Sequence, residues 1–232
     1  MHYAIIAAGE GSRLKEEGIT SPKPLVKING ETLLERLIRI FRNNHAESIS
    51  LIINEEMKEV QEFVAQMQLP VPLHCVVKST PGSMHSFAAL APYLYSGKFI
   101  LTTVDTIFHE NEFAKYIGAF ESDNTLDGLM AVTDFIDDEK PLYVGTDESL
   151  TITGFHDRNV DCTYISGGIY GLTPKALTVL EHCMETGKLR MREFQRELVH
   201  AGLHLKAMPF SKIIDVDHAG DIEKAEAFGN KE

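Results

Sequence analysis

The stretch Ala7-Ala8-Gly9-Glu10-Gly11-Ser12-Arg13-Leu14 continues an apolar run that begins at Tyr3, and Ser21-Pro22-Lys23-Pro24-Leu25 follows shortly afterwards. A short apolar run is typical of a buried strand, so the glycines begin where that strand should end. Ligands bind at this end of the strands in α/β proteins. The two glycines would let backbone amides approach a phosphate chain, while Ser12 adds a hydroxyl and Arg13 a permanent positive charge. The stretch therefore predicts a loop that binds a polyanion.

Two other phosphate-binding loops do not fit these residues. The Rossmann fingerprint needs a third glycine where Leu14 stands, and a Walker A loop needs a Gly-Lys-Ser/Thr ending that this sequence lacks. What the chain has is a compound motif, Ala-Ala-Gly-x-Gly-Ser-Arg-Leu followed about ten residues later by Pro-Lys-Pro-Leu.

This compound motif resembles the signature of the nucleotidyltransferase superfamily that makes NDP-sugars and related activated alcohols. The resemblance implies an α/β fold, Rossmann-like, with three layers α/β/α around a mixed, mostly parallel sheet, known as the nucleotide-diphospho-sugar transferase fold. It also implies a reaction, in which a phosphate monoester attacks the α-phosphorus of an NTP and pyrophosphate leaves. By the same resemblance the nucleotide is expected to contact Ala7, Ala8, Gly9, Gly11 and Ser12.

The composition fits an ordinary globular protein. Of the 232 residues, 44% are hydrophobic and 24% are charged, and we expect a single domain over residues 1–232. The formal net charge of −12 argues against nonspecific nucleic-acid binding, because most of the surface would repel a phosphate backbone. The early cations Arg13, Lys15, Lys23 and Lys27 bracket the glycine loop and supply the local positive charge that a nucleotide requires.

Cysteine usage and the absence of long apolar runs predict a cytoplasmic protein. Cys75, Cys162 and Cys183 are far apart and show no metal-binding spacing, so we expect reduced thiols. The N-terminus enters a strand without a secretory leader, and no apolar run reaches the roughly 18 residues of a membrane span. We therefore expect no membrane partner.

The hydrophobic pattern predicts alternating strands and helices in the first part of the chain. The expected strands cover 3–8, 48–53, 71–77, 98–105, 128–133, 142–144, 149–155, 163–172 and 203–209, and the expected helices cover 32–41, 55–67, 87–94, 111–120, 174–180 and 191–201. Strands predominate for some distance beyond Asp134. We therefore expect a nucleotide-binding half over 1–133 and an acceptor-binding half over 134–232.

Carboxylates at the ends of strands suggest a metal site. Asp105 ends an apolar strand, and it would lie near the glycine loop if the two strands are parallel neighbours. Mg²⁺ prefers one or two carboxylates with waters and phosphate oxygens, so Asp105 suits it. The segment 213–225 resembles the terminal Asp-Val-x-Thr-Pro-x-Asp-Leu of the family, which implies a second metal ligand at Asp215 or at Asp217, expected on the same strand face. Both stay open, and Asp221 is expected to cap the following helix.

Three weaker resemblances imply the remaining contacts. Gly82-Ser83-Met84 is similar to a Gly-Thr-Ala segment of the family that lies against the nucleobase, which implies that Gly82 and Ser83 bind the nucleotide. The stretch 152–158 is similar to a segment ending in Phe-x-Glu-Lys-Pro, with Asp157 and Arg158 in place of the Glu and Lys. The stretch 166–171 resembles Asn-x-Gly-Ile-Tyr, and its Gly168 joins Asp157 and Arg158 as an expected acceptor-binding residue.

The implied reaction gives each predicted residue a role. Arg13 and the loop amides would hold the β- and γ-phosphates, and Mg²⁺ would bridge the α-phosphate. Lys23 would stabilise charge between the α-phosphate and the attacking phosphate. The expected partners are an NTP and a small phosphorylated acceptor, with a sugar 1-phosphate giving an NDP-sugar as the leading interpretation.

Two alternatives remain at this point. One is a phosphocholine-type cytidylyltransferase, whose members are also short single domains. The other is a non-catalytic nucleotide-binding regulatory protein of the same fold, since Val104-Asp105-Thr106 lacks the second local acid of many family members. The nucleobase, the acceptor and the oligomeric state, a homo-oligomer included, are left open by the sequence.

Overall fold

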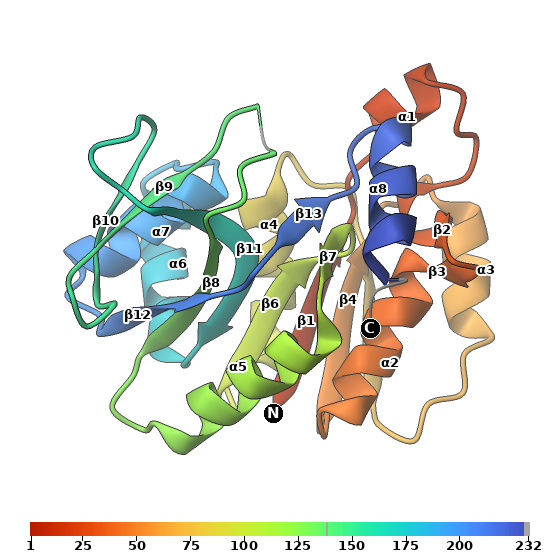
Figure 1. Ribbon diagram of the computed structural model, residues 1–232. Helices are drawn as coiled ribbons and strands as arrows, with labels where there is room; N and C mark the ends of the chain where they lie inside the picture. The colour runs from red at the N-terminus through yellow and green to blue at the C-terminus, as the bar shows by residue number, and fades with distance from the viewer. Residues whose placement is uncertain (138, 230–232) are drawn as a thin grey trace.

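A mixed β-sheet with helices on both faces organises residues 1–137 and 139–229, which the computed structural model describes (Figure 1). The strands are β1 (His2–Ala7), β2 (Lys27–Ile28), β3 (Glu31–Thr32), β4 (Ser48–Ile53), β5 (Leu73–Val77), β6 (Phe99–Thr103), β7 (Thr106–Phe108), β8 (Gly128–Thr133), β9 (Tyr143–Thr146), β10 (Ile152–His156), β11 (Tyr164–Leu172), β12 (Leu205–Pro209) and β13 (Ile213–Asp215). The α-helices are α1 (Ser12–Glu16), α2 (Leu33–Asn43), α3 (Lys58–Ala65), α4 (Ser83–Leu90), α5 (Glu110–Ser122), α6 (Lys175–Glu185), α7 (Met191–His200) and α8 (Ala219–Gly229). Short 3-10 helices form at Lys23–Leu25 and Ala91–Tyr93.

The main sheet joins a parallel part to a part that contains antiparallel pairs. Its strand order is β10-β9-β11-β6-β1-β4-β5, with β8 paired to β11 and β12 paired to β8. The pairs around β1 are parallel, whereas β11 runs antiparallel to each of its neighbours. The predicted mixed three-layer α/β fold is confirmed. The division into halves at residue 133 stays a prediction.

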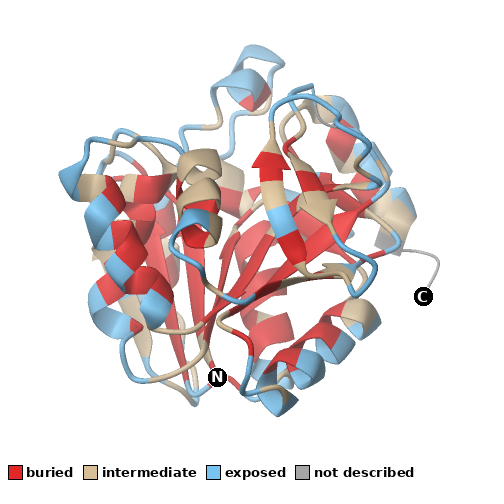
Figure 2. Cartoon of the chain, turned by 90° about the vertical axis from the view of Figure 1, so that its left-hand side faces the viewer, coloured by how far each residue is buried: buried red, intermediate tan, exposed pale blue. Residues whose placement is uncertain are grey.

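Two hydrophobic cores lie on the two faces of the sheet. Alternate residues of β1 supply both, since Tyr3 and Ile5 belong to one core and Ala4 and Ile6 to the other. Helices α2, α3 and α5 cover the first face, and α4, α6 and α7 cover the second. Figure 2 shows the buried strands between helices whose outer surfaces are exposed. Within the described ranges, no helix has both the length and the apolar character needed to span a membrane.

The order in which the chain adds strands to the sheet changes direction at β1. From β1 it proceeds outward to β4 and β5, and it then returns to pair β6 with the other side of β1. Ile6 lies opposite Thr103, and the Val104 amide donates to the Ile6 carbonyl at 3.0 Å. Crevices for ligands form where parallel strands diverge in this way. The segments that follow β1 and β6, which are the glycine loop and Asp105, therefore meet at one crevice.

Strand β13 reaches this crevice by crossing close to β11. A Cβ atom at Gly167 would lie 2.2 Å from Ile213 Cδ1 and 3.1 Å from the Ala131 carbonyl oxygen, so a larger residue would force Ile213 and the backbone near Ala131 to shift. Beyond it, β13 pairs with β7 and sets Asp215 opposite Thr106. The strand ends there, and the expectation that Asp217 shares its face is wrong. Asp217 lies in the turn before α8, where its amide bonds to Asp221 rather than to a neighbouring strand.

Candidate active site

The glycine loop is fixed against the lysine that follows it. Gly11 has φ +61° and precedes α1, in the left-handed region that side chains rarely adopt. A Cβ atom there would also lie 3.2 Å from Lys23 Cβ. Both the conformation and the close contact therefore require glycine, and they place the loop directly beside Lys23.

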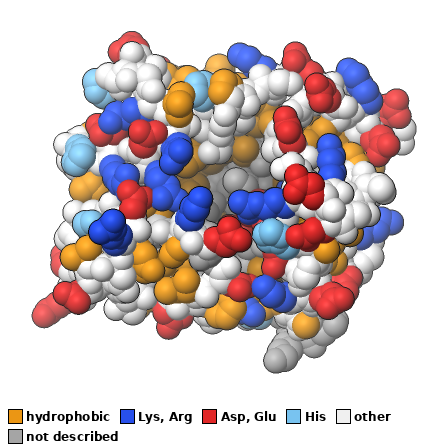
Figure 3. Space-filling view, turned by 90° about the horizontal axis from the view of Figure 1, so that it is seen from above, with side chains coloured by type: hydrophobic (Ala, Val, Ile, Leu, Met, Phe, Trp, Pro, Cys, Tyr) orange, Lys and Arg blue, Asp and Glu red, His pale blue; other side chains and the backbone are white. Residues whose placement is uncertain are grey.

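A cleft of about 420 Å³ opens beside the loop. Its lining residues are Ile6, Ala7, Ala8, Gly9, Gly11, Ser12, Arg13, Lys23, Thr80, Gly82, Ser83, Ser86, Thr103, Val104, Asp105 and Asp217. The structure thus brings together every residue predicted to bind the nucleotide, both predicted catalytic cations and two of the three predicted metal ligands. Figure 3 shows the hollowed face of the molecule, with positive and negative side chains around the hollow.

An ion network crosses the floor of this cleft. The Lys23 ammonium forms ion pairs with Asp105 Oδ2 and, at 2.6 Å, with Asp217 Oδ1. The Arg13 guanidinium donates to the other Asp217 oxygen at 3.1 Å. The side chains of Lys23 and Asp105 are only 11% and 15% exposed, whereas that of Arg13 is 53% exposed. Lys23 is therefore the enclosed member of the network, and Arg13 is the exposed one at its rim.

The charges in this cluster shift each other's pKa values. Burial alone would lower the pKa of Lys23, but Asp105 and Asp217 outweigh that effect and raise it. Burial, and then repulsion from Asp105 and Asp217, raises the pKa of Asp215 to about 7, against the opposing influence of Thr106 and Lys23. Three carboxylates, those of Asp105, Asp215 and Asp217, thus lie beside two cations, Lys23 and Arg13.

The carboxylates fit a partial magnesium site rather than a complete cage. Among residues 1–137 and 139–229, no group of three or more His, Cys, Asp or Glu side chains is arranged to hold a metal ion. Asp105 Oδ1 is nevertheless buried, and nothing in the described chain hydrogen-bonds to it. Mg²⁺ bound with a nucleotide takes one or two protein carboxylates and completes its shell with waters and phosphate oxygens. Asp105, with Asp217 or Asp215, meets that requirement.

A second hollow of about 230 Å³ adjoins the first and shares Arg13 and Asp217 with it. Its lining adds Thr133, Phe135, Asp137, Glu139, Ile165, Ser166, Gly167, Ile213, Ile214, Asp215, His218, Asp221 and Lys224. A molecule in this hollow would meet one in the first cleft at the shared residues. Asp215, the third predicted metal ligand, lines this second hollow rather than the first cleft.

The predicted acceptor residues are not brought into this second hollow. Gly168 does not line it, although the neighbouring Gly167 does. Asp157 and Arg158 lie instead in a third hollow of about 500 Å³, together with Tyr143, and this hollow shares Glu139 with the second one. There Asp157 forms ion pairs with Arg192 at 2.6 Å and Arg196 at 2.8 Å, which lower its pKa.

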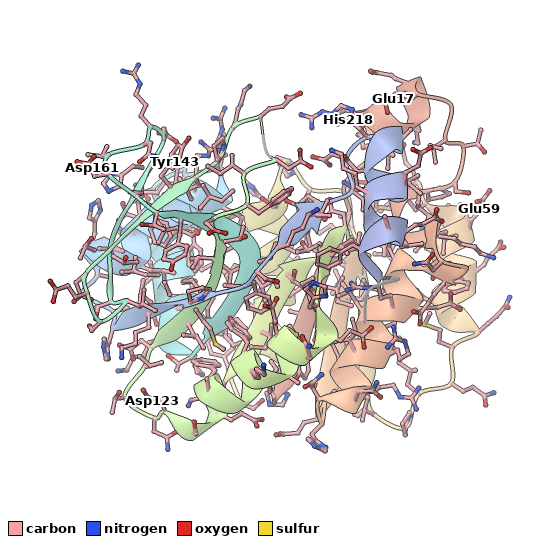
Figure 4. The ribbon with its side chains drawn as sticks, viewed as in Figure 1. Glu17, Glu59, Asp123, Tyr143, Asp161 and His218 are labelled. Carbon is pink, nitrogen blue, oxygen red and sulfur yellow. The ribbon has the colours of Figure 1, made fainter. Side chains whose placement is uncertain are left out.

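A clamp between α1 and α8 was not anticipated from the sequence. Glu17 accepts from the Ala219 amide at 2.6 Å and is paired with His218 Nδ1 at 2.6 Å, and Figure 4 shows the two side chains meeting between the helices. Asp221 accepts from the Asp217 and His218 amides, consistent with its predicted capping role. The Asp217, His218 and Ala219 amides at the start of α8 are therefore hydrogen-bonded within the protein.

Several polar residues that lie in or beside the first cleft were also not identified from the sequence. Thr80 Oγ1 and Ser86 Oγ are 2.6 Å apart, and both residues line the first cleft. Asn54 bonds to Ser79 at 2.9 Å and donates to the Ala8 carbonyl at 3.4 Å, which connects the loop after β4 to the glycine loop. The position of Asn54 in the sequence could have marked it as a site residue, because it directly follows a buried strand and lies at the same edge of the sheet as Asp105.

Comparisons with known proteins agree with this geometry. The model of the family described as a MobA-like NTP transferase domain matches residues 3–146, which is more than half of the chain. A bifunctional protein GlmU of Methanococcus maripaludis is 23% identical over 208 residues, covering 87% of this chain and 48% of that protein. A bifunctional IPC transferase and DIPP synthase of Thermococcus kodakarensis is 31% identical over 105 residues, covering 45% of this chain and 23% of that protein. The chain spans about half the length of the GlmU relative.

Two solved structures share the fold over nearly the whole chain. The inositol-1-phosphate CTP transferase from T. maritima aligns with a TM-score of 0.81 and 22% identity, covering 99% of this chain and 96% of that one. A putative glucose-1-phosphate thymidylyltransferase from Bacillus anthracis aligns with a TM-score of 0.87 and 17% identity, covering 100% and 96%. At these identities the likeness establishes the architecture and leaves the substrates to be argued from the site.

Proposed function

The chain belongs to the MobA-like NTP transferase family, and from that premise we propose that it transfers a nucleotidyl group from an NTP to a small phosphorylated acceptor. The observation that carries this proposal is the position of Lys23 and Arg13. Lys23 lies in the nucleotide cleft, Arg13 lines both hollows, and both contact Asp217 where the hollows meet. Two phosphorylated molecules in the two hollows would meet at these cations.

The reaction follows from the needs of phosphorus chemistry. An oxygen of the acceptor phosphate attacks the α-phosphorus, a new P–O bond forms, and the bond from the α-phosphorus to the bridging oxygen of the β-phosphate breaks. The electron pair of that bond leaves with pyrophosphate. Such a step needs two anions held in line and their charge neutralised. Arg13 and the loop amides bind the departing phosphates in this scheme, and Lys23 stabilises charge between the two reacting phosphates.

We propose that Asp105, with Asp217 or Asp215, binds Mg²⁺ together with the nucleotide. The unpartnered Asp105 Oδ1 and the raised pKa of Asp215 support this assignment. The ion would supply charge neutralisation at the α-phosphate. The carboxylates would hold the ion, and Gly82 and Ser83, which line the cleft together with Thr80 and Ser86, would provide the surface for the base.

For the acceptor we propose a polyhydroxylated 1-phosphate, either a sugar 1-phosphate or an inositol phosphate. The second hollow offers the hydroxyls of Thr133 and Ser166 and the carboxylates of Asp137 and Glu139, which suit sugar or cyclitol hydroxyls. A phosphocholine acceptor is less favoured, because the Lys212 ammonium already lies 4.2 Å from the centre of the Phe135 ring. That ring is the aromatic side chain of the hollow.

Pyrophosphate release tests the proposal. CTP, UTP, GTP, ATP and dTTP would each be combined with glucose 1-phosphate, N-acetylglucosamine 1-phosphate, inositol 1-phosphate and phosphocholine, first with Mg²⁺ and then with EDTA. We expect a metal-dependent signal from one or a few of these combinations. A folded protein that binds NTP but releases no pyrophosphate in any combination would contradict the proposal and favour the non-catalytic alternative.

A further inference from the structure

We propose that Lys23 is the resident cation of the metal site, and that a divalent ion enters the site only together with the phosphates of a nucleotide. This inference rests on the proposed function for the identity of the metal ligands. It concerns a different property of the site, namely which cation balances Asp105 and Asp217 before any substrate is bound.

The Lys23 ammonium is held by two of the carboxylates that the proposed function assigns to the metal. It pairs with Asp105 Oδ2 and lies 2.6 Å from Asp217 Oδ1, so both carboxylates are directed at one positive charge. Arg13 takes the second oxygen of Asp217. The remaining oxygen, Asp105 Oδ1, is buried. A divalent ion arriving alone would therefore find three of the four carboxylate oxygens already paired.

The lysine has little freedom to leave this position without a substitute anion. Its side chain is 11% exposed, and a Cβ atom at Gly11 would lie only 3.2 Å from the Lys23 Cβ, so the lysine stem is closely packed against the loop. Displacing its ammonium would leave an enclosed charge without a partner, which is strongly unfavourable. Asp217 is different, because it is 44% exposed and also paired with the open Arg13.

A triphosphate changes this balance. Its oxygens provide a new partner for the Lys23 ammonium, and they also supply the ligands that Mg²⁺ prefers to protein atoms. Both changes release Asp105 and Asp217 for the metal at the moment the nucleotide arrives. Metal and nucleotide binding are then coupled, and by thermodynamic linkage each raises the affinity for the other.

The coupling makes an unusual prediction, because removing a catalytic lysine should strengthen metal binding. Mn²⁺, used alone as the probe, would be titrated into the nucleotide-free protein and followed by its electron paramagnetic resonance signal. We expect Lys23→Met to bind Mn²⁺ about tenfold more tightly than the wild type, within the usual range of coupling between sites. Lys58→Met, which removes an exposed charge at the start of α3, is the matched control and should leave the affinity unchanged.

Two further measurements test where Mn²⁺ binds. Adding Asp105→Asn to Lys23→Met should abolish the gain in Mn²⁺ affinity, which would show that the ion binds at this carboxylate. A non-hydrolysable NTP analogue should raise the Mn²⁺ affinity of the wild type and thereby reduce its difference from Lys23→Met. Thermal unfolding would verify that the variants fold, and Lys23→Gln would replace Lys23→Met if the latter does not.

The inference is overturned if a folded Lys23→Met or Lys23→Gln protein binds Mn²⁺ no more tightly than the Lys58→Met control. It is overturned equally if the gain survives Asp105→Asn. These outcomes are separate from those of the pyrophosphate assay. Pyrophosphate release without a gain in Mn²⁺ affinity would retain the proposed function and reject the role of Lys23, while the reverse pattern would retain the role of Lys23 and reject the reaction.

Discussion

The nucleotide cleft and the second hollow meet at Arg13 and Asp217, but they are built in opposite ways. The cleft takes almost half of its lining from one short stretch, residues 6–13, which includes the glycine loop. The second hollow is lined by several short segments that are far apart in the chain, and apart from Arg13 they lie between Thr133 and Lys224. A site that binds phosphate mainly through local backbone can be identified from a motif, whereas a site composed of scattered side chains depends on topology.

The largest effect expected is at the boundary between the two regions. Lys23→Ala removes the charge that is proposed to act on both phosphates, and loss of one such preorganised group typically costs about 10²–10³ in turnover. We expect this loss with the fold intact, measured by pyrophosphate release and thermal unfolding. Lys58→Ala should retain full turnover. Near-normal turnover in Lys23→Ala would mean that the boundary between the hollows is not where the reaction occurs.

The next effect tests whether topology builds the second hollow. Gly167→Ala adds a Cβ atom 2.2 Å from Ile213 Cδ1, and overpacking of this kind costs about 1–3 kcal/mol. We expect a lower free energy of unfolding in urea, together with a raised acceptor KM because β13 is displaced.

Ile213→Val, which removes the clashing Cδ1 atom, provides the control for that prediction. The double variant should recover most of the lost free energy of unfolding, since the two substitutions act on one contact. If Gly167→Ala were as stable as the wild type, the close crossing of β13 over β11 would not constrain the hollow.

A smaller effect is expected at the clamp that joins the regions. Glu17→Gln keeps the size of the side chain but removes the negative charge that faces His218. Helix α1, which contains Arg13, should then be held less firmly against α8. We expect the KM for NTP to rise about two- to fivefold with little change in kcat, as befits an exposed ion pair. Glu16→Gln, a substitution of the adjacent exposed carboxylate, is the control. A change in kcat alone would assign Glu17 a role other than positioning.

The smallest effect concerns the carboxylate that the sequence resemblance placed at the acceptor. Asp157 forms ion pairs with Arg192 and Arg196, and it does not line the second hollow. Figure 4 shows Tyr143, which shares the hollow of Asp157, on strand β9, whereas His218 lies beside α8. Asp157→Asn should therefore change the acceptor KM by less than about twofold at neutral pH, an effect typical of exposed ion pairs. Asp161→Asn is a control in the same segment.

The pH dependence of this pair follows from the pKa of Asp157, which lies below its usual value of 3.8. A lowered pKa means that the ion pairs contribute stability above that usual value and lose it as the pH falls through the folded-state pKa. The free energy of unfolding of Asp157→Asn should therefore fall less than that of the wild type as the pH is lowered into strong acid. A large rise in acceptor KM in the same variant would restore Asp157 to the acceptor site.

The sequence predicted the parts of the molecule that local interactions determine. The helix α2 begins at a capping box in which Thr32 and Glu35 bond reciprocally, and its start lies one residue from the predicted one. Asp105 follows β6 beside the glycine loop because β1 and β6 are parallel neighbours, as expected. These features depend on residues that are close in sequence, or on a general rule for parallel sheets.

The rest depends on contacts between distant residues, which the sequence does not specify. The choice between Asp215 and Asp217 could not be made from letter spacing, because it depends on where β13 ends and on the contacts of Lys23 and Arg13. Asp157 and Arg158 matched a family segment, but the ion pairs with α7 that hold Asp157 could not be seen in a linear pattern. The roles of these residues remain predictions.

The contact between Lys23 and Asp217 spans 194 positions of the chain. During synthesis on the ribosome, the glycine loop and Lys23 emerge well before Asp217, the carboxylate that contacts Lys23. An N-terminal intermediate can form β1, β4 and α2, but it holds an incomplete nucleotide site. Binding of NTP would then report that the segment around Asp217 has docked against Lys23, which gives folding studies of this protein a signal for the formation of that long-range contact.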